Sequence, residues 1–364
     1  MTPLGIGIVG TGNIAGRYAR DILAQPEIRL VAATDLDADR AAAFGAEHGC
    51  RVHASLDELL ADDEIDIIVN LTVHHAHYEV TRSALEAGRH VYSEKPLALR
   101  SVDAADLVEL AAARDRRLGC SPATFLGEAQ QTAAAFIRAG RLGTVRAIYA
   151  DVSWGRIEAW HPAPAPFYDV GPLADVGVYP LTLATTMLGP TRSVRAAGWD
   201  LMPKRQALDG TSFRIGSPDF IVATVELATG TVLRLTSSFY VGRPAAGRGT
   251  MEFHGDEASL AIGSFQEFDA SVEFGRFGDD YAPVELVRPP FRGTAWARGV
   301  AEMAASIDAG RPHRASAELA AHLVDIIDAA SVSMADDGRA VEVTSTFAQP
   351  DLMPWAEAPA ASPP

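Results

Sequence analysis

From residue 4 to residue 120, short apolar runs alternate with stretches in which apolar residues recur every three or four positions. The runs predict buried strands, and the three-to-four spacing predicts amphipathic helices. We expect strands at 4–9, 28–34, 65–71 and 90–93, and helices at 13–23, at 37–48, after the Ser55/Glu58 capping pattern, and up to Gly88. This alternation is typical of an α/β domain with a parallel sheet covered on both faces.

After Cys120 the pattern changes, because strand-like segments follow one another without crossover helices. The expected elements are a helix at 128–139, strands at 145–154, 220–227, 232–240, 251–254 and 259–262, and helices at 295–309 and 316–335. Such an order indicates an antiparallel sheet in an α+β domain. We therefore predict a first domain over 1–122, a second over 123–355, and a disordered tail rich in alanine and proline over 356–364.

Composition narrows the classes of function. A chain of 364 residues with 48% hydrophobic residues is long enough for two domains. The net charge of −16 argues against a nucleic-acid or anionic-membrane partner, and no apolar run reaches the length of a membrane span. The N-terminus leads directly into a strand, so no secretory signal is expected, and two cysteines fit a reducing cytoplasm.

A glycine-rich turn, GTGNIA, lies between the first strand and the first helix. In this pattern Gly10 permits a tight turn, Gly12 lets the backbone approach a pyrophosphate, and Ala15 allows the helix to pack closely on the strand. The amides of Asn13 and Ile14 then lie at a helix N-terminus, where the helix dipole favours phosphates. The turn predicts a dinucleotide site for NAD or NADP.

Asp35 ends the second expected strand, where an acidic residue accepts hydrogen bonds from the adenosine ribose and repels a ribose phosphate. This position favours NAD over NADP. Arg40 lies nearby and could serve a phosphate, which leaves NADP open. The alternative for Asp35 is an N-cap of the next helix.

The third strong strand is followed by Thr72 and by histidines at 74, 75 and 77. Imidazole is a common metal ligand, but Glu79 is the only nearby acid and no thiolate stands at ligand spacing. Loops at strand ends in such a sheet lie over the cofactor crevice. We therefore predict that Thr72, His74 and His77 line the cofactor or cap a helix, and we predict no metal site.

The tripeptide Glu94-Lys95-Pro96 follows the strand at 90–93. Pro96 restricts Lys95 to an extended backbone. Most lysines are solvated at the surface, and that alternative applies here. However, ligands of open α/β sheets bind at the carboxyl ends of the strands, which favours a lysine at the nicotinamide site.

In the later domain, the stretch GPLADVGVY runs from Gly171 to Tyr179. If a helix begins near Leu173, Asp175 and Tyr179 share one face. A carboxylate and a phenol could orient a diol and carry a proton, and a nearby ammonium would lower the pKa of the phenol from about 10. The alternative is a buried amphipathic tyrosine capped by Asp175.

These motifs together are similar to those of the Gfo/Idh/MocA oxidoreductases: GTGNIA, the loop ending at His77, ALEAGRHVYSEKP and DVGVY. The resemblance covers essentially the whole chain. It implies a Rossmann domain, a C-terminal domain with a large, mostly antiparallel open sheet, and an NAD(P)-dependent dehydrogenase acting on a sugar, polyol or cyclic diol. It also implies a homodimer or homotetramer.

The resemblance implies roles for individual residues. Lys95 matches the lysine that contacts the substrate hydroxyl and the nicotinamide edge, with Glu94 and Pro96 beside the cofactor. Asp175 matches the acid that orients the substrate, and Tyr179 stands at the proton-transfer position. Tyrosine at this position resembles the branch of glucose-fructose oxidoreductase, dihydrodiol dehydrogenase and xylose dehydrogenase.

A loop rich in proline and aromatic residues precedes the Asp175 segment, and in it His161 and Tyr168 are candidate substrate contacts. A packed connecting loop is the alternative. Two other functions remain open for the chain: transient oxidation by a tightly bound NAD that assists elimination, hydrolysis or epimerisation, and nucleotide sensing without catalysis.

Overall fold

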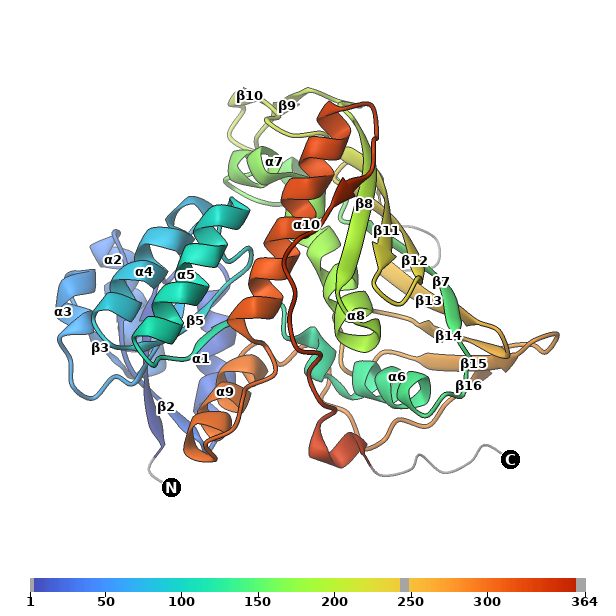
Figure 1. Ribbon diagram of the computed structural model, residues 1–364. Helices are drawn as coiled ribbons and strands as arrows, with labels where there is room; N and C mark the ends of the chain where they lie inside the picture. Colours follow the sequence, from blue (N-terminus) through green and yellow to red (C-terminus); the bar gives the residue numbers. More distant parts are fainter. Residues whose placement is uncertain (1–2, 243–248, 358–364) are drawn as a thin grey trace. The chain divides into compact units, whose positions relative to one another are not determined.

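The computed structural model describes residues 3–242 and 249–357 (Figure 1). The chain divides into two compact units. Unit 1 comprises the chain up to Ala123 together with Ala295–Val324, and unit 2 comprises Thr124–Thr294 and the chain from Asp325 onward. The sequence placed residues 295–324 in the second domain, whereas the structure groups them with unit 1.

Unit 1 contains a six-stranded parallel sheet in the order β3-β2-β1-β4-β5-β6. Its elements are β1 Leu4–Val9, α1 Ala15–Leu23, β2 Ile28–Thr34, α2 Ala38–His48, β3 Arg51–Val52, α3 Leu56–Leu60, β4 Ile67–Asn70, η1 His74–Ala76, α4 His77–Glu86, β5 His90–Ser93, α5 Ser101–Ala113, β6 Leu118–Cys120, α9 Arg298–Asp308 and the first part of α10, Ala317–Ala335. The order reverses direction between β1 and β4, which is where ligands of such sheets bind.

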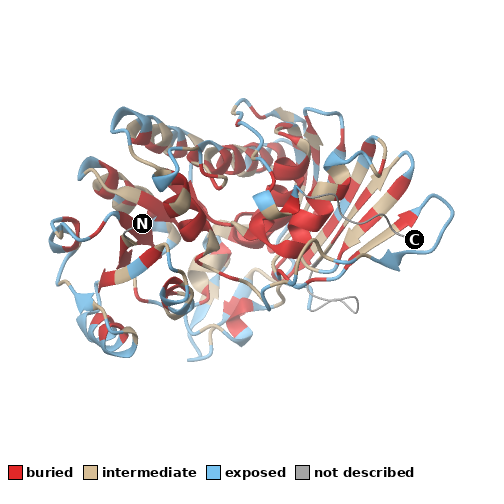
Figure 2. Cartoon of the chain, turned by 90° about the horizontal axis from the view of Figure 1, so that it is seen from below, coloured by how far each residue is buried: buried red, intermediate tan, exposed pale blue. Residues whose placement is uncertain are grey.

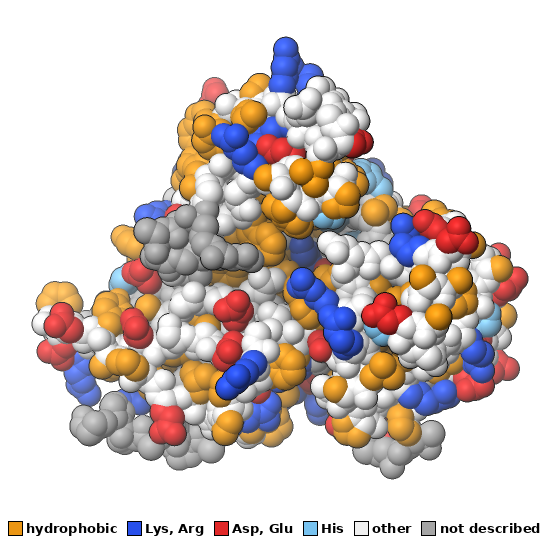
Figure 3. Space-filling view, turned by 180° about the vertical axis from the view of Figure 1, so that it is seen from behind, with side chains coloured by type: hydrophobic (Ala, Val, Ile, Leu, Met, Phe, Trp, Pro, Cys, Tyr) orange, Lys and Arg blue, Asp and Glu red, His pale blue; other side chains and the backbone are white. Residues whose placement is uncertain are grey.

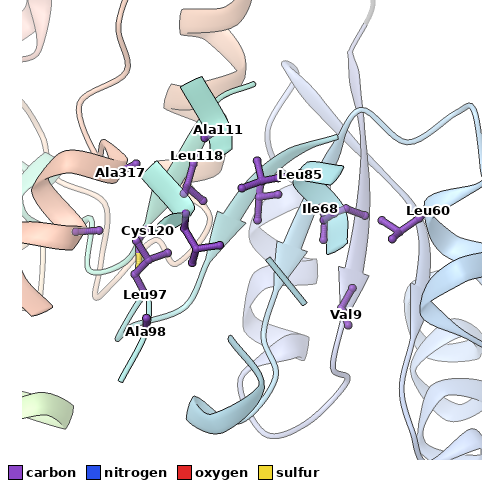
Figure 4. Close-up of a cluster of buried hydrophobic side chains, with 14 of the residues drawn as sticks. Val9, Leu60, Ile68, Leu85, Leu97, Ala98, Ala111, Leu118, Cys120 and Ala317 are labelled. Atoms are coloured by element: carbon purple, nitrogen blue, oxygen red, sulfur yellow. The ribbon is translucent and has the colours of Figure 1, made fainter. Parts of the chain in front are cut away.

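One face of this sheet is closed by apolar side chains from α3, α4, α5 and the start of α10 (Figure 4). Ile68 and Leu118 on the strands and Leu85 and Ala111 on the helices belong to this cluster. Residues of the central strands are buried on both faces, as the continuous apolar runs predicted. The parallel sheet of unit 1 is therefore confirmed. The strand β6 and the alanine-rich helix α5 were not predicted, because the apolar run of β6 is too short and the apolar residues of α5 do not recur at a clear helical spacing.

Unit 2 contains a nine-stranded sheet in the order β16-β15-β14-β13-β7-β12-β11-β8-β17, and β9 pairs with β10 separately. Its elements are η2 Thr124–Leu126, α6 Glu128–Arg138, β7 Val145–Ser153, η3 Ile157–Ala159, α7 Ala165–Pro172, η4 Leu173–Gly177, α8 Val178–Leu188, β8 Thr191–Trp199, β9 Lys204–Gln206, β10 Ser212–Arg214, β11 Phe220–Leu227, β12 Val232–Ser238, β13 Gly249–Gly255, β14 Ala258–Ile262, β15 Val272–Arg276, β16 Ala282–Pro283, the remainder of α10, β17 Val341–Glu342 and η5 Pro354–Ala356.

The large sheet is mostly antiparallel, as predicted, with one parallel pair between β7 and β12. Figure 2 shows buried and exposed positions alternating along its strands. In β12, Leu233 and Leu235 are buried, while Val232 and Arg234 are exposed. Arg234 pairs across the sheet with Asp151 of β7 at 2.6 Å. The sheet thus has one apolar face and one face that carries polar cross-strand pairs.

The predicted tail differs from the structure at its first residue. Ala356 is buried in η5. Residues 358–364 of that tail lie outside the described residues. The chain before η5 is held to unit 2, because the side chain of Gln349 donates to the Thr186 carbonyl at 2.9 Å.

Charged side chains of both signs share the molecular surface. On the face shown in Figure 3, acidic side chains are interspersed with basic ones. Exposed partners form ion pairs such as Arg146–Asp256 at 2.8 Å, and pairs of this kind contribute about 0–1 kcal/mol each. No helix within residues 3–242 and 249–357 is both long enough and apolar enough to cross a membrane.

A partly buried histidine, His90, is expected to make the stability of unit 1 depend on pH. Burial, together with the smaller effect of the charges of Arg116 and Arg117, lowers the pKa of His90 to about 4. An unfolded histidine has a pKa near 6.5, so between pH 6.5 and 4 the unfolded chain binds more protons. The contribution of the neutral His90 to stability is therefore fully present above pH 6.5 and is lost as the pH falls toward 4. Burial lowers the pKa of His77 and His313 as well, with the same sign.

Between pH 7 and pH 5 the free energy of unfolding should fall less in His90→Asn than in the wild type. We expect a difference of about 1 kcal/mol, a value reduced for the partial exposure of His90. Asparagine keeps an acceptor for the Arg117 amide, which donates to His90 Nδ1 at 2.8 Å. Urea unfolding at the two pH values measures the difference. Equal losses in both proteins would show that His90 does not carry this dependence.

Candidate active site

The glycine-rich turn has the geometry of a pyrophosphate cradle. Gly10 has a φ of 91°, and a Cβ there would lie 2.8 Å from the carbonyl oxygen of Leu71, so only glycine fits. A Cβ on Gly12 would meet nothing within 4 Å, which leaves open space over the turn. Helix α1 follows at Ala15, so the turn leads into a helix N-terminus, whose dipole favours phosphates. These residues fit a dinucleotide.

Asp35 lies just beyond the end of β2. Its carboxylate accepts hydrogen bonds from the Thr11 amide at 2.7 Å, from the Asp37 amide at 2.9 Å and from Nη2 of Arg40 at 2.6 Å. Partial burial raises the pKa of Asp35, but these hydrogen bonds outweigh it and bring the pKa down to about 2. Asp35 is therefore ionised at neutral pH and is paired with Arg40.

The N-cap of helix α2 is Asp37, not Asp35. The side chain of Asp37 accepts from the Arg40 amide at 3.0 Å. The alternative that Asp35 serves as this cap is thus wrong. The carboxylate of Asp35 is left at the strand end, at the position where the sequence predicted a ribose contact.

The histidine loop is tied to the segment that carries the lysine. His77 is buried, and its Nδ1 lies 2.6 Å from the carbonyl oxygen of Pro96 while its Nε2 lies 3.1 Å from that of Thr72. Burial lowers the pKa of His77, and the two carbonyls oppose that shift. A neutral ring has one N–H, and the shorter distance assigns it to Nδ1. The Thr72 hydroxyl in turn donates to Oδ1 of Asn70 at 2.7 Å.

No group of three or more histidine, cysteine, aspartate or glutamate side chains is arranged to hold a metal ion within the residues that the structure describes. In the histidine loop, the rings of His74 and His77 lie 5.9 Å apart between centroids. The contacts of His77 with backbone carbonyls link the loop after β4 to the segment after β5.

Lys95 is half-buried directly after β5, between the buried residues Glu94 and Pro96. Its amide donates to Oε2 of Glu94 at 3.1 Å, and the Lys95–Pro96 peptide bond is cis. Lys95 is one of two lysines in the chain, the other being Lys204, whereas 29 of the 31 cationic side chains are arginines. The four predicted residues Gly10, Asp35, Thr72 and Lys95 all follow carboxyl ends of strands of one sheet.

In unit 2, Asp175 and Tyr179 lie where a helix was expected to begin. Residues Leu173–Gly177 form a π-helical turn that continues into α8. Single π turns inside helices are frequent at functional sites. Asp175 and Tyr179 are both buried, and the ring of Tyr179 stacks on Phe265 with centroids 6.0 Å apart. The carboxylate and the phenol are thus held on adjacent turns.

The aromatic loop before this turn presents His161 at a partly exposed position. The ring of His161 contacts Trp160 and Phe167 edge to face, at centroid distances of 5.5 and 4.8 Å. Its Nδ1 accepts from the Ala163 amide at 3.1 Å. Nε2 therefore carries the proton that a ligand oxygen could accept.

Tyr168 has a different environment from the one predicted. It is 1% exposed, and its hydroxyl donates to Glu158. Glu158 also pairs with Arg205 at 2.7 Å, and Arg205 pairs with Asp219. Because the hydroxyl is used inside this buried network, Tyr168 supports the loop and does not present itself as a substrate contact.

Several residues of the site were not predicted. Thr11 contacts Asp35 through its amide and its hydroxyl, and Tyr18 contacts Glu94 through its hydroxyl. Tyr18 lies on the buried face of α1. The helical spacing shows that its ring is buried, but it carries no information on what its hydroxyl meets.

Two descriptions of known families match the chain. "Oxidoreductase family, NAD-binding Rossmann fold" matches residues 4–121, and "GFO/IDH/MocA C-terminal domain" matches residues 130–261. Among solved structures, levoglucosan dehydrogenase in complex with NADH and L-sorbose aligns with a TM-score of 0.82 at 18% identity, over 94% of this chain and 99% of that one. Aldose-aldose oxidoreductase from Caulobacter crescentus complexed with glycerol aligns with a TM-score of 0.78 at 21% identity, over 93% and 99%. These structures share the fold.

Sequence relatives agree with the family. The chain is 34% identical over 213 residues to dTDP-3,4-didehydro-2,6-dideoxy-alpha-D-glucose 3-reductase of Streptomyces antibioticus, which covers 56% of this chain and 62% of that protein. It is 31% identical over 198 residues to D-xylose 1-dehydrogenase (NADP(+)) of Hypocrea jecorina, which covers 48% and 51%. Each match spans less than two thirds of the relative. With both family descriptions matched over most of its length, the chain belongs to the Gfo/Idh/MocA oxidoreductase family.

Proposed function

We propose that this protein is an NAD(P)-dependent oxidoreductase that transfers a hydride between the nicotinamide and a hydroxyl-bearing carbon of a sugar, polyol or cyclic diol. The observation that carries this proposal is the half-buried Lys95, fixed at the same strand-end edge as the glycine-rich turn. Relatives that are named as sugar reductases and sugar dehydrogenases support the substrate class.

The rarity of lysine in this chain supports a chemical role for Lys95. A chain that uses arginine for 29 of its 31 cations has little need of lysine as a solvated surface charge. An ammonium differs from a guanidinium, because it is a compact point charge that can donate to one oxygen from any side. Such a group suits an alkoxide that develops at a single atom.

The residues that would hold the nucleotide lie along one edge of the unit 1 sheet. Gly10, Gly12, Asn13 and Ile14 would take the pyrophosphate. Asp35 and Arg40 would bind the adenosine ribose, and Thr72, His74, Lys95 and Pro96 would line the nicotinamide. When bound, the nicotinamide supplies the acceptor or donor of the hydride.

In this proposal three side chains act on one substrate alcohol. Tyr179 takes the proton of the reacting hydroxyl as the hydride leaves the carbon. The ammonium of Lys95 stabilises the negative charge that develops on that oxygen, and Asp175 accepts a hydrogen bond from the neighbouring hydroxyl and so fixes the orientation of the diol. His161 would contact a more distant hydroxyl. Reduction of a ketone uses the same groups in reverse.

The test of this proposal is a spectrophotometric screen of sugars and polyols with NAD and NADP in parallel. We expect reduced nicotinamide to form with at least one sugar or polyol. Binding of the nucleotide without turnover of any compound would indicate a sensor. Consumption of a sugar without reduced nicotinamide would indicate transient oxidation by a bound cofactor, and either result would replace the proposed function.

The pairing of Asp35 with Arg40 makes a prediction about the choice of nucleotide. We expect the wild type to prefer NAD, because the ionised Asp35 repels a ribose phosphate and holds Arg40 at 2.6 Å. In Asp35→Ser the guanidinium is released and can bind a phosphate. A charge-assisted hydrogen bond contributes about 1.5–3 kcal/mol, so the ratio of NADP affinity to NAD affinity should rise about tenfold or more.

Titration of both nucleotides against the unliganded protein measures this ratio without any turnover. Asp37→Ser is the matched control, because Asp37 lies 3.5 Å from the same guanidinium and serine remains a good N-cap for α2. We expect the control to keep the preference for NAD. An equal rise of the ratio in both variants would mean that the loss of any negative charge near Arg40, and not the position of Asp35, sets the preference.

A further inference from the structure

A buried hydrogen-bonded network lies beside Lys95 in unit 1. The hydroxyl of Tyr18 on α1 donates to Oε1 of Glu94 at 2.6 Å and lies 2.9 Å from Oγ of Ser121, which follows β6. Tyr18 is fully buried, and Glu94 and Ser121 are each 8% exposed. We call these three residues the Tyr18–Glu94–Ser121 network.

The network reaches the backbone of Lys95 directly. The second carboxylate oxygen of Glu94, Oε2, accepts from the Lys95 amide at 3.1 Å. The Glu94 amide donates to the carbonyl of Asn70 at 2.9 Å, which ties the same residue to the end of β4. On the other side of Lys95, the carbonyl of Pro96 is held by His77 at 2.6 Å. Lys95 is thus a half-exposed residue between two buried, hydrogen-bonded anchors.

A charged carboxylate at the buried position of Glu94 carries an unfavourable desolvation energy. Burying a charge is unfavourable unless it is hydrogen-bonded, and an apolar side chain would pack there without that cost. What the carboxylate provides is one rigid link between the Tyr18 hydroxyl and the Lys95 amide. Tyr18 lies in the first turn of the helix that starts after the glycine-rich turn, so the link joins the nucleotide loop to the lysine.

We propose that Glu94 is a positioning residue for Lys95: held by Tyr18 and Ser121, its carboxylate fixes the Lys95 backbone so that the ammonium is placed for reaction. This inference rests on the proposed function, since it gives Glu94 a purpose through the catalytic role of Lys95. It differs from the sequence prediction, in which Glu94 contacts the cofactor itself.

The two lysines make a direct test possible. Protein labelled with [¹⁵N]lysine gives two backbone amide signals, from Lys95 and Lys204, and the variant Lys204→Arg identifies which is which. An amide that donates to a carboxylate resonates downfield. We expect the Lys95 signal to move upfield in Tyr18→Phe and in Glu94→Gln, while the Lys204 signal stays in place. Ser121→Ala is a milder variant should Glu94→Gln fail to fold.

Tyr78→Phe is the matched control. Tyr78 on α4 also donates from its hydroxyl to a carboxylate, that of Asp106 on α5 at 2.8 Å, but this pair lies on the outer helices of unit 1. We expect this variant to move neither lysine signal and to leave kcat unchanged.

The second measurement separates positioning from stability. We expect Tyr18→Phe to lower kcat about 10- to 100-fold with little change in nucleotide affinity, because a small displacement of a catalytic group is enough for such a loss. The double variant Tyr18→Phe/Glu94→Gln should be no worse than the more affected single variant, since the residues act as one unit. If the network had a purely structural role, Tyr18→Phe would lower the melting temperature and leave kcat unchanged.

Each outcome decides the proposal. A shifted Lys95 signal together with a lowered kcat supports it. An unmoved Lys95 signal, or an unchanged kcat in both single variants, overturns it, whatever happens to the melting temperature. If the wild type turns over no sugar or polyol, the proposed function fails. The Lys95 signal then still decides on its own whether the network holds this residue.

Discussion

Replacing Lys95 by alanine is expected to lower kcat by about 100- to 1,000-fold, because the variant lacks the ammonium that stabilises the developing alkoxide. Nucleotide affinity should change little, since the pyrophosphate and the adenosine ribose bind at Gly10–Ile14 and Asp35 in the proposal. Steady-state kinetics with the best sugar of the screen, and titration of the nucleotide, measure the two effects separately. Lys95→Arg should not restore activity, because a planar guanidinium cannot take the place of the ammonium.

The chain provides a clean control for this experiment. Lys204→Ala removes the only other lysine of the sequence, at an exposed position in β9, and should leave kcat unchanged. Tyr179→Phe removes the proposed proton acceptor while keeping the ring that stacks on Phe265, and we expect a loss of similar size. Undiminished activity in both Lys95→Ala and Tyr179→Phe would refute the assignment of these residues.

The largest effect on stability is expected at Arg205. Its guanidinium is fully buried and pairs with Glu158 and Asp219, whose side chains are 10% and 0% exposed. Arg205 Nε also donates to the Met202 carbonyl at 2.8 Å. In Arg205→Met two buried carboxylates lose their counter-charge, and we expect the free energy of unfolding to fall by about 3–5 kcal/mol.

Urea unfolding of Arg205→Met measures this loss. Arg146→Met is the control, because Arg146 also lies in unit 2 but forms an exposed pair with Asp256. It should lower the free energy of unfolding by less than about 1 kcal/mol. The combined change Arg205→Met/Glu158→Gln/Asp219→Asn should recover part of the stability, because it removes the stranded charges. If Arg205→Met were no less stable than Arg146→Met, the buried network would not stabilise unit 2.

Local patterns predicted much of the fold to the residue. The strands β1, β2 and β5 begin and end where the apolar runs did. The capping pattern at Ser55 is present with a shifted return bond: the Glu58 amide donates to Ser55 Oγ at 3.2 Å, and Glu58 Oε2 accepts from the amide of Ala54, one residue before the N-cap, at 3.0 Å. These features depend on residues within a few positions of each other, which is the range over which a sequence pattern carries information.

The features that escaped prediction depend on distant residues. Tyr18 and Glu94 are 76 positions apart, and Arg205 and Glu158 are 47 apart, so nothing local indicates that they pair. The return of residues 295–324 to unit 1 is of the same kind. The edge strands β16 and β17 have two residues each and exist only because a neighbouring strand pairs with them. Motifs therefore identified Lys95, Asp175 and Tyr179 as candidates, while the contacts that hold Lys95 required the structure.

The central claim is direct hydride transfer between a substrate carbon and the nicotinamide. The most direct measurement gives the enzyme the sugar or polyol found in the screen, deuterated at its carbon-bound positions, and analyses the nucleotide by mass spectrometry. We predict one deuterium in each reduced nucleotide and as much reduced nucleotide as substrate consumed. Reduced nucleotide without deuterium, or substrate consumed with no reduced nucleotide, would contradict the account.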